Sequence, residues 1–130
     1  MAKTVDKAKR QLAERRGHRA EALAALWLTL KGWRVVARNL RTPHSEVDMV
    51  AVRGSVLAVV EVKARDTLEA AGGSLDWNTR RRLERAAEHI RLSAPYAVRP
   101  GGAEREVRID AVLVAGLRLR HVRGAWYGGD

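Results

Sequence analysis

The stretch Val56-Leu57-Ala58-Val59-Val60-Glu61-Val62-Lys63-Ala64 carries two charged side chains in an otherwise apolar run. Its β-branched residues and its short length predict a buried strand near the centre of a sheet. Glu61 and Lys63 are two residues apart, so their side chains point to the same face of that sheet. Burying a charge is costly unless the charge is paired, neutralised or bound to a metal. This strand therefore indicates a functional site.

A second strand, Glu46 to Val52, precedes the first across the two-residue hairpin loop Gly54-Ser55. If Arg53 pairs with Val56, the register places Asp48 opposite Glu61, and a four-residue loop gives the same result. Two carboxylates about 4 Å apart repel each other by roughly 4 kcal/mol at an effective dielectric constant of about 20. Because carboxylate oxygens are ligands for hard cations, we predict a Mg²⁺ or Mn²⁺ site at Asp48 and Glu61. The other interpretation is a pair of solvent-facing carboxylates beside arginines.

Two further charged residues have two interpretations each. Lys63 either lies beside the metal site as a catalytic residue or forms a cross-strand salt bridge with Glu46, which the same register places opposite it. Glu21 is nearly the only charge in the run Ala20 to Leu28, which predicts a largely buried helix. Its carboxylate either reaches a partner in the interior or lies at the solvent edge of the helix.

These residues also carry a family resemblance. Asp48 followed by Glu61-Val62-Lys63 resembles the PD-(D/E)XK motif of the restriction-endonuclease-like nucleases. Other segments are similar to one branch of that superfamily, the YraN family of uncharacterised bacterial proteins, and the resemblance covers about Gly17 to Val114. These segments are Gly17-His18-Arg19-Ala20-Glu21, Asn39-Leu40-Arg41, Glu46-Val47-Asp48, Val60-Glu61-Val62-Lys63-Ala64-Arg65 and Arg108-Ile109-Asp110-Ala111-Val112.

The resemblance implies an α/β restriction-endonuclease-like core that hydrolyses phosphodiester bonds. It implies Asp48 and Glu61 as catalytic metal ligands, with Glu21 and the carbonyl oxygen of Val62 as additional ligands, and Lys63 as the residue that orients the attacking water. Archaeal Holliday-junction resolvases share this core and act as dimers. The resemblance therefore also implies branched DNA as a substrate and a homodimer.

Composition is compatible with this function. The chain has 130 residues, which is the size of one domain, and its formal net charge of +10 favours a polyanionic partner. It has no cysteine, which predicts a cytoplasmic protein without disulfides or thiolate metal sites. We expect no signal peptide, because residues 1–16 are polar, and no membrane span, because the apolar stretch from Ala20 to Leu30 is too short.

Periodicity and turn residues predict the element order αβββαββ, a mixed β-sheet flanked by helices in a single domain over residues 1–130. We expect the basic helix over residues 1–16 to be frayed and Asp66 to Ser74 to form a mobile loop. Asp76 is predicted to cap the second helix. The predicted helices are Thr4 to Lys31 and Trp77 to Ser93, and the strands besides the hairpin are Trp33 to Leu40, Glu106 to Ala115 and Leu117 to Trp126.

Several residues outside the carboxylate pair are candidates for contacts with nucleic acid. Trp77 and Trp126 either stack on bases or pack against the protein. His44 either touches the substrate or is ordinary surface, and Asp110 either pairs with a neighbouring arginine or supports the site. The candidate phosphate-binding residues are Arg34, Arg38, Arg41 and Arg65 near the hairpin, and Arg80 and Arg81 on the second helix, where pairs with glutamates are the alternative.

The sequence thus supports two functions. The first is a metal-dependent endonuclease that selects DNA structure, since the chain contains no obvious element for reading base sequence. The second is a nucleic-acid-binding module that retains the site without cleaving. RNA as the substrate remains open.

Overall fold

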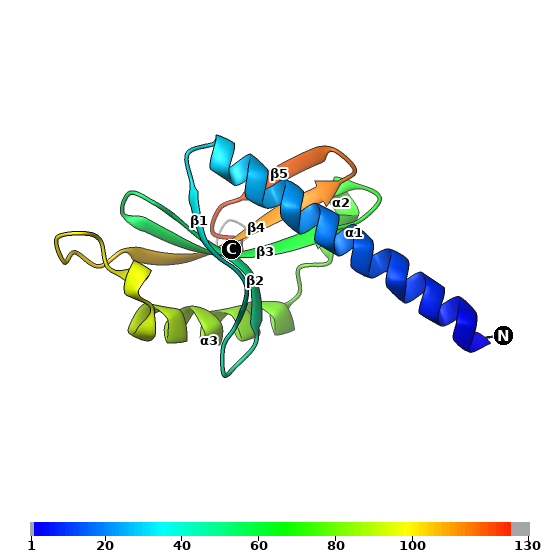
Figure 1. Cartoon of the computed structure of the whole chain (residues 1–130), viewed down its shortest axis with the longest axis horizontal. Helices are drawn as coiled ribbons and strands as arrows, with labels where there is room; N and C mark the ends of the chain where they lie inside the picture. The colour runs from blue at the N-terminus through cyan, green and yellow to red at the C-terminus, as the bar shows by residue number, and fades with distance from the viewer. Residues whose placement is uncertain (1, 126–130) are drawn as a thin grey trace.

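The computed structural model describes residues 2–125, with side chains from Val5 onward. The long first helix crosses one side of the sheet and its N-terminal half projects beyond it (Figure 1). The elements are α1 (Ala2–Leu30), β1 (Arg34–Arg41), β2 (Glu46–Arg53), β3 (Val56–Ala64), α2 (Leu68–Gly73), α3 (Trp77–Ser93), a 3₁₀ turn (Pro95–Ala97), β4 (Glu106–Ala115) and β5 (Arg118–Val122).

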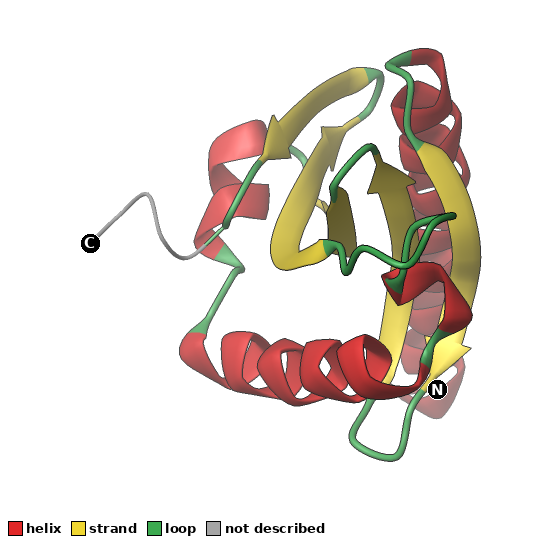
Figure 2. Cartoon of the chain, turned by 90° about the vertical axis from the view of Figure 1, so that its left-hand side faces the viewer, coloured by secondary structure: helices red, strands yellow, loops and turns green. Residues whose placement is uncertain are grey.

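The strands form one mixed sheet in the order β1-β2-β3-β4-β5. All neighbouring pairs are antiparallel except β3 and β4, which are parallel because α2 and α3 provide the crossover between them. The sheet lies between α1 and α3 (Figure 2). The predicted fold, a mixed sheet flanked by helices in the order αβββαββ, is confirmed when α2 and α3 are counted together.

Each face of the sheet has its own core. On one face, Ala24 and Leu28 of α1 pack with Met49 and Val60 in the α1-side cluster. On the other face, residues of α3, including Leu83, Ala86 and Ile90, pack with strand residues such as Val50 and Val59 in the α3-side cluster. β3 is therefore covered on both faces, as its apolar run from Val56 to Val60 predicts.

The hairpin between β2 and β3 has the predicted register. Arg53 pairs with Val56, and the ladder continues to Met49 opposite Val60. Gly54, with φ of 56°, occupies the first central position of the turn, where a type II′ hairpin requires glycine. The turn and the apolar pattern thus fix which residues of β2 face β3.

The segment Asp66 to Ser74 differs from the prediction. Most of it forms the short helix α2, in which the side chain of Thr67 accepts a hydrogen bond from Ala70 N. Ala71 is fully buried against Ala111 and Leu113 of β4, so tertiary packing stabilises a segment whose glycines suggested a loop.

The ends of the chain also differ in detail from the predictions. α1 continues without a break from Ala2 through Gly17, and fraying of its first turns stays a prediction. The last strand ends at Val122, and Trp126, where it was predicted to end, lies outside the described residues. None of the helices in residues 2–125 has the length and hydrophobicity needed to cross a bilayer.

Candidate metal centre

The candidate site lies where β2 and β3 separate. Their ladder ends at Met49 and Val60, one residue before Asp48 and Glu61 would pair. Val47 and Val50 both belong to the α3-side cluster, so the strict alternation of β2 breaks around Asp48. In the gap, Asp48 Oδ2 accepts a hydrogen bond of 2.8 Å from Val62 N. A carboxylate thus replaces a backbone partner at the point where the strands diverge.

Glu61 is the most strongly perturbed acid of the site. Its residue is only 6% exposed, and its side chain hydrogen-bonds the side chain of Asp48. Burial, followed by the hydrogen bond to Asp48 and the negative charge of that residue, raises the pKa of Glu61 to about 8. Burial and the neighbouring acid therefore favour the protonated form of Glu61, and a cation beside the two acids would favour the charged form. The structure therefore brings together the two carboxylates that the sequence singles out.

Arg82 of α3 forms an ion pair with Glu61. Its Nη2 donates to Glu61 Oε2 at 2.9 Å, and its Nη1 donates to the carbonyl oxygen of Glu46 at 3.1 Å. The sequence does not mark Arg82 as a site residue, because it lies in a run of arginines with glutamates at helical spacing. Its position one residue before buried Leu83 was the available signal, since that places it near the core-facing side of α3.

Lys63 contributes to the same electrostatic environment. Its positive charge lowers the pKa of Glu61, opposing the effect of burial. The alternative salt bridge is not formed: among the described residues, Lys63 and Glu46 make no ion pair within 4.0 Å. Lys63 is half-buried and lies two residues after Glu61 on β3.

Glu21 approaches the pair from α1. Burial, and then the negative charge of Asp48, raises the pKa of Glu21, while the charges of His18 and Arg38 lower it. Its Oε2 is buried and has no hydrogen-bond partner in the described part of the chain. A buried carboxylate oxygen without a donor is a position that a cation or a bound water would satisfy.

The donor set fits a hard divalent cation with few protein ligands. Within residues 2–125, no group of three or more His, Cys, Asp or Glu side chains is assembled to hold a metal ion. Asp48 and Glu61 form a pair, with Glu21 nearby. Mg²⁺ is commonly bound by one or two carboxylates and takes its remaining ligands from water and substrate phosphates. The carbonyl oxygen of Val62 is on the strand that carries Glu61, and its role as a ligand stays a prediction.

The arginines predicted to bind phosphates lie at different distances from the pair. Arg38 is exposed on β1 opposite Met49, and Arg41 is exposed opposite Glu46, so both flank the position of Asp48. Arg65 is exposed directly after β3, where its Nη1 donates to the carbonyl oxygen of Ala64. Arg34 lies opposite Val52, four residues and about 13 Å along β2 from Asp48. The register therefore does not bring Arg34 to the site.

Most of the remaining predicted residues lie in or near α3. Asp76 caps the helix as predicted, accepting from Thr79 N at 2.8 Å. Arg80 donates to Glu84 at 2.7 Å, and Arg81 donates to Asn78 at 3.0 Å, so both take part in local helix-surface pairs. His44 is exposed and its ring lies near that of His89, and its contact with substrate stays a prediction. Trp126 lies outside the described residues.

Asp110 forms a separate buried network. It is fully buried and accepts two hydrogen bonds from Arg108, at 2.7 and 2.9 Å, and one from Gly124 N at 3.0 Å. His121 Nε2 lies 2.8 Å from Asp110 Oδ2, and His121 Nδ1 lies 3.2 Å from Lys31 Nζ. The ion pair with a neighbouring arginine is thus present, and Asp110 ties together β4, β5 and the end of α1.

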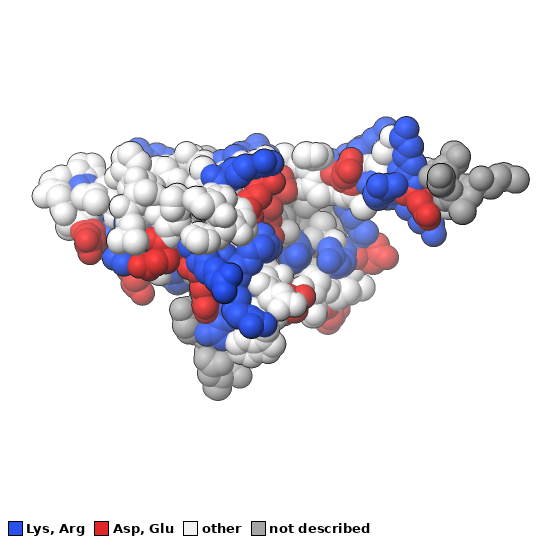
Figure 3. Space-filling view, turned by 90° about the horizontal axis from the view of Figure 1, so that it is seen from below, with Lys and Arg blue, Asp and Glu red and all other residues white. Residues whose placement is uncertain are grey.

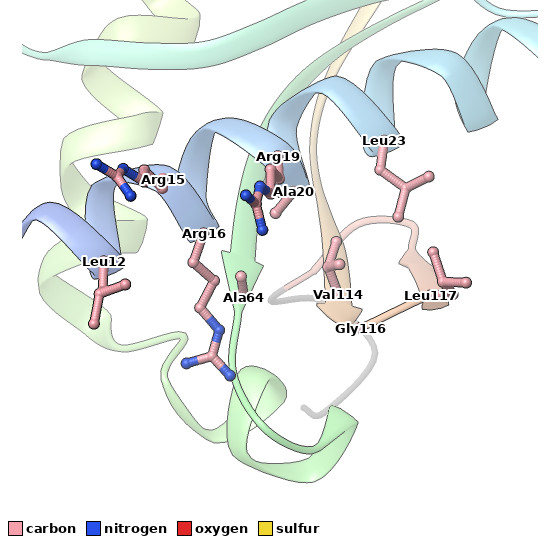
Figure 4. Close-up of a pocket in the computed structure, with 10 residues that line it drawn as sticks. All are labelled: Leu12, Arg15, Arg16, Arg19, Ala20, Leu23, Ala64, Val114, Gly116 and Leu117. Carbon is pink, nitrogen blue, oxygen red and sulfur yellow. The ribbon is translucent and has the colours of Figure 1, made fainter.

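A groove of about 570 Å³ lies between α1 and the ends of β3 and β4 (Figure 4). Its apolar walls include Leu12 and Leu117, and Arg15, Arg16 and Arg19 line its α1 side. Arg16 is ion-paired with Asp66. Neither Asp48 nor Glu61 lines this groove, so it is distinct from the carboxylate pair.

On the face drawn in Figure 3, Lys and Arg gather in two regions. Figure 3 shows Lys and Arg across the middle of the face that carries α3, with Asp and Glu among them. A second group lies on the projecting N-terminal part of α1. The two regions together account for much of the basic excess on this view.

The sequence is similar to known proteins of one family. Residues 20–114 match the model of the uncharacterised protein family UPF0102. A UPF0102 protein of Parvibaculum lavamentivorans is 50% identical over 115 residues, covering 88% of this chain and 83% of that protein. One from Caulobacter vibrioides is 43% identical over 129 residues, covering 98% of this chain and 99% of that protein. UPF0102 and YraN are two names for the same family. The chain therefore belongs to the UPF0102 family.

Proposed function

We propose that this protein is a divalent-cation-dependent endonuclease that hydrolyses DNA phosphodiester bonds and selects DNA structure rather than sequence. The observation that carries the proposal is the meeting of two acids from neighbouring strands: Glu61 is only 6% exposed, and partly buried Asp48 beside it accepts from Val62 N. The resemblance of Asp48 and Glu61-Val62-Lys63 to the PD-(D/E)XK motif supports the same conclusion.

In this proposal, the carboxylates of Asp48 and Glu61 would hold one or two Mg²⁺ or Mn²⁺ ions. The cation, when bound, lowers the pKa of a water molecule and offsets negative charge on the phosphate. Lys63 orients the attacking water and stabilises the phosphorane-like transition state. Glu21 accepts hydrogen bonds from water or adds a ligand through its unpartnered Oε2. Arg82 holds Glu61 in place through its hydrogen bond to Oε2.

The substrate follows from charge and resemblance. A net charge of +10, with Arg38, Arg41 and Arg65 around the site, favours a phosphate backbone. Resemblance to Holliday-junction resolvases favours branched DNA and a homodimer. The absence of cysteine favours action in the cytoplasm.

A second function is favoured by one observation. Arg82 already neutralises Glu61, and no third acid completes a ligand group in the described residues. A site whose charge is balanced by the protein itself is what a non-cleaving nucleic-acid-binding module would have. The test must therefore separate binding from cleavage.

The test is incubation of the full-length protein with supercoiled, linear, single-stranded and four-way-junction DNA in Mn²⁺ or in EDTA. We expect Mn²⁺-dependent nicking of at least one substrate, lost in Glu61→Ala and retained in Glu69→Ala, a matched change at an exposed glutamate of α2. Retained DNA binding without nicking of any substrate would support the binding module instead.

A further inference from the structure

Trp77 is an aromatic side chain that the fold leaves exposed. It is the first residue of α3, and 62% of its surface is accessible. Tryptophan is highly buried in most proteins, because its large apolar surface is stabilised by packing. The α3-side cluster does not include Trp77. The protein core therefore does not explain this side chain.

The indole ring is held in a defined place. Asp76 accepts a hydrogen bond from Thr79 N, which fixes the start of the helix. The guanidinium carbon of Arg80 lies 4.8 Å from the centre of the Trp77 ring, and Arg80 Nε donates to Glu84. The guanidinium lies over one face of the indole and places positive charge there, so a base would stack on the other face. Such a pair suits a nucleotide, whose base stacks while its phosphate is attracted by the cation.

The position of Trp77 relative to the carboxylate pair is set by α3. Arg82, which contacts Glu61, lies five residues further along the helix, about 7.5 Å along its axis. Asp76, next to Trp77, also senses this site: besides its hydrogen bonds to Thr79, the charges of Lys63 and Arg82 lower its pKa. Trp77 therefore lies in the first turn of α3, about one and a half turns before the residue that contacts Glu61.

We infer that Trp77 stacks on an unpaired base of the nucleic acid whose phosphate lies at Asp48 and Glu61. The inference rests on the proposed function for the place of that phosphate. In a duplex, both faces of each base are covered by neighbouring bases, so stacking on Trp77 would first require a base to leave the stack. A single strand, or a junction with an unpaired nucleotide, offers that face without this cost. Trp77 would therefore give the protein a preference for single-stranded character beside the scissile phosphate.

The test measures binding without cleavage. Full-length protein in EDTA is titrated into a labelled 12-nucleotide pyrimidine strand and into the blunt duplex of the same sequence, and fluorescence anisotropy is followed. We expect Trp77→Ala to weaken single-strand binding by about 10-fold and duplex binding by much less. Leu117→Ala, a truncation of an 87% exposed side chain on the β4–β5 turn, should change neither. Equal weakening of both substrates by Trp77→Ala, or no weakening of either, would overturn the inference.

A second variant protects the test against misfolding. Trp77→Phe keeps an aromatic ring and should retain most of the single-strand affinity. The intrinsic tryptophan fluorescence of the wild type should be quenched by the strand, and this quenching should largely disappear in Trp77→Phe. Quenching that persists unchanged would contradict stacking on Trp77.

The outcome is separable from that of the nuclease proposal. If no DNA is nicked but the Trp77-dependent preference is present, the stacking inference stands and the binding module becomes the function. If nicking requires Glu61 but Trp77→Ala binds single strands as the wild type does, the nuclease stands and the stacking inference fails.

Discussion

Asp110 shows how one buried carboxylate can be fully satisfied by its surroundings. It has four hydrogen bonds, from Arg108, His121 and Gly124, and no exposed surface. Because its oxygen accepts, His121 Nε2 donates, and the other ring nitrogen is left to accept from Lys31. Such a residue stabilises the fold. Glu61 differs, because the negative charge of Asp48 beside it disfavours its ionised form.

Acid stability should depend on Asp110. Burial raises its pKa, but the hydrogen bonds from His121, Arg108 and Gly124 outweigh burial and lower the pKa to about 2, from 3.8. A lowered pKa stabilises the folded protein fully above about pH 4, and this contribution is lost as the pH falls towards 2. We expect Asp110→Asn to lower the free energy of unfolding by about 3 kcal/mol at pH 7.

Urea unfolding of wild type and Asp110→Asn between pH 7 and pH 2.5 measures this difference. The gap between the two proteins should shrink as the pH falls below 4. Asp66→Asn, at a side chain that is 93% exposed, is the matched control and should change stability little. A gap that stays constant down to pH 2.5 would contradict the role given to Asp110.

Asp48 should behave in the opposite way. In Asp48→Asn, the amide oxygen can still accept from Val62 N, while the amide nitrogen can donate to Glu61, so the repulsion between two acids is removed. We expect this variant to be more stable than wild type in EDTA at pH 8, by about 1 to 2 kcal/mol, and to lose any Mn²⁺-induced rise in Tm. Thermal unfolding with and without Mn²⁺ tests both, and a lower Tm in EDTA would be evidence against a strained acid pair.

At the scale of elements, the β2–β3 hairpin and α3 together create the site. The hairpin brings the two acids together, and α3 supplies Arg82 from a position 21 residues away from Glu61 in the sequence. Because Glu61 is buried, removing its cation leaves a carboxyl group that is less well satisfied. α3 is therefore part of the site as well as of the core.

Removing Arg82 tests this dependence. Arg82→Gln should lower stability by about 1 to 3 kcal/mol, since it deprives a buried acid of a charged hydrogen bond. It should also reduce Mn²⁺-dependent nicking. Arg85→Gln, at an exposed arginine one turn further along α3, should leave both nearly unchanged. Equal effects from the two substitutions, measured by urea unfolding and a nicking assay, would show that Arg82 has no special role.

The elements themselves were largely predictable from sequence, because the apolar periodicity and the Gly54-Ser55 turn fix the strands and their register. α2 was missed because its glycines indicate a loop, whereas burial of Ala71 against β4 stabilises the helix. Arg82 was missed because its partner is distant in sequence. Arg34 lies on the same strand as Arg38 and Arg41, but sequence alone does not give its position along β2. The register places it opposite Val52, four residues from Asp48.

At the scale of the whole molecule, the basic surface should determine how nucleic acid binding responds to salt. The net charge is +10, and we propose that Arg38, Arg41, Arg65 and Lys63 each contact one phosphate. Four phosphate contacts predict a slope of about −3 in a plot of log binding constant against log salt concentration for a single strand. Anisotropy titrations in EDTA at several NaCl concentrations measure this slope. A slope close to zero would contradict binding through phosphates.

The central claim is that Asp48 and Glu61 jointly bind a divalent cation. A crystal of the full-length protein soaked in Mn²⁺ at pH 8 tests it most directly, because anomalous scattering locates manganese without a model of the site. We expect one or two anomalous peaks, each within coordination distance of carboxylate oxygens from both residues. Carboxyl groups that remain hydrogen-bonded to each other, with no anomalous peak between them, would contradict it.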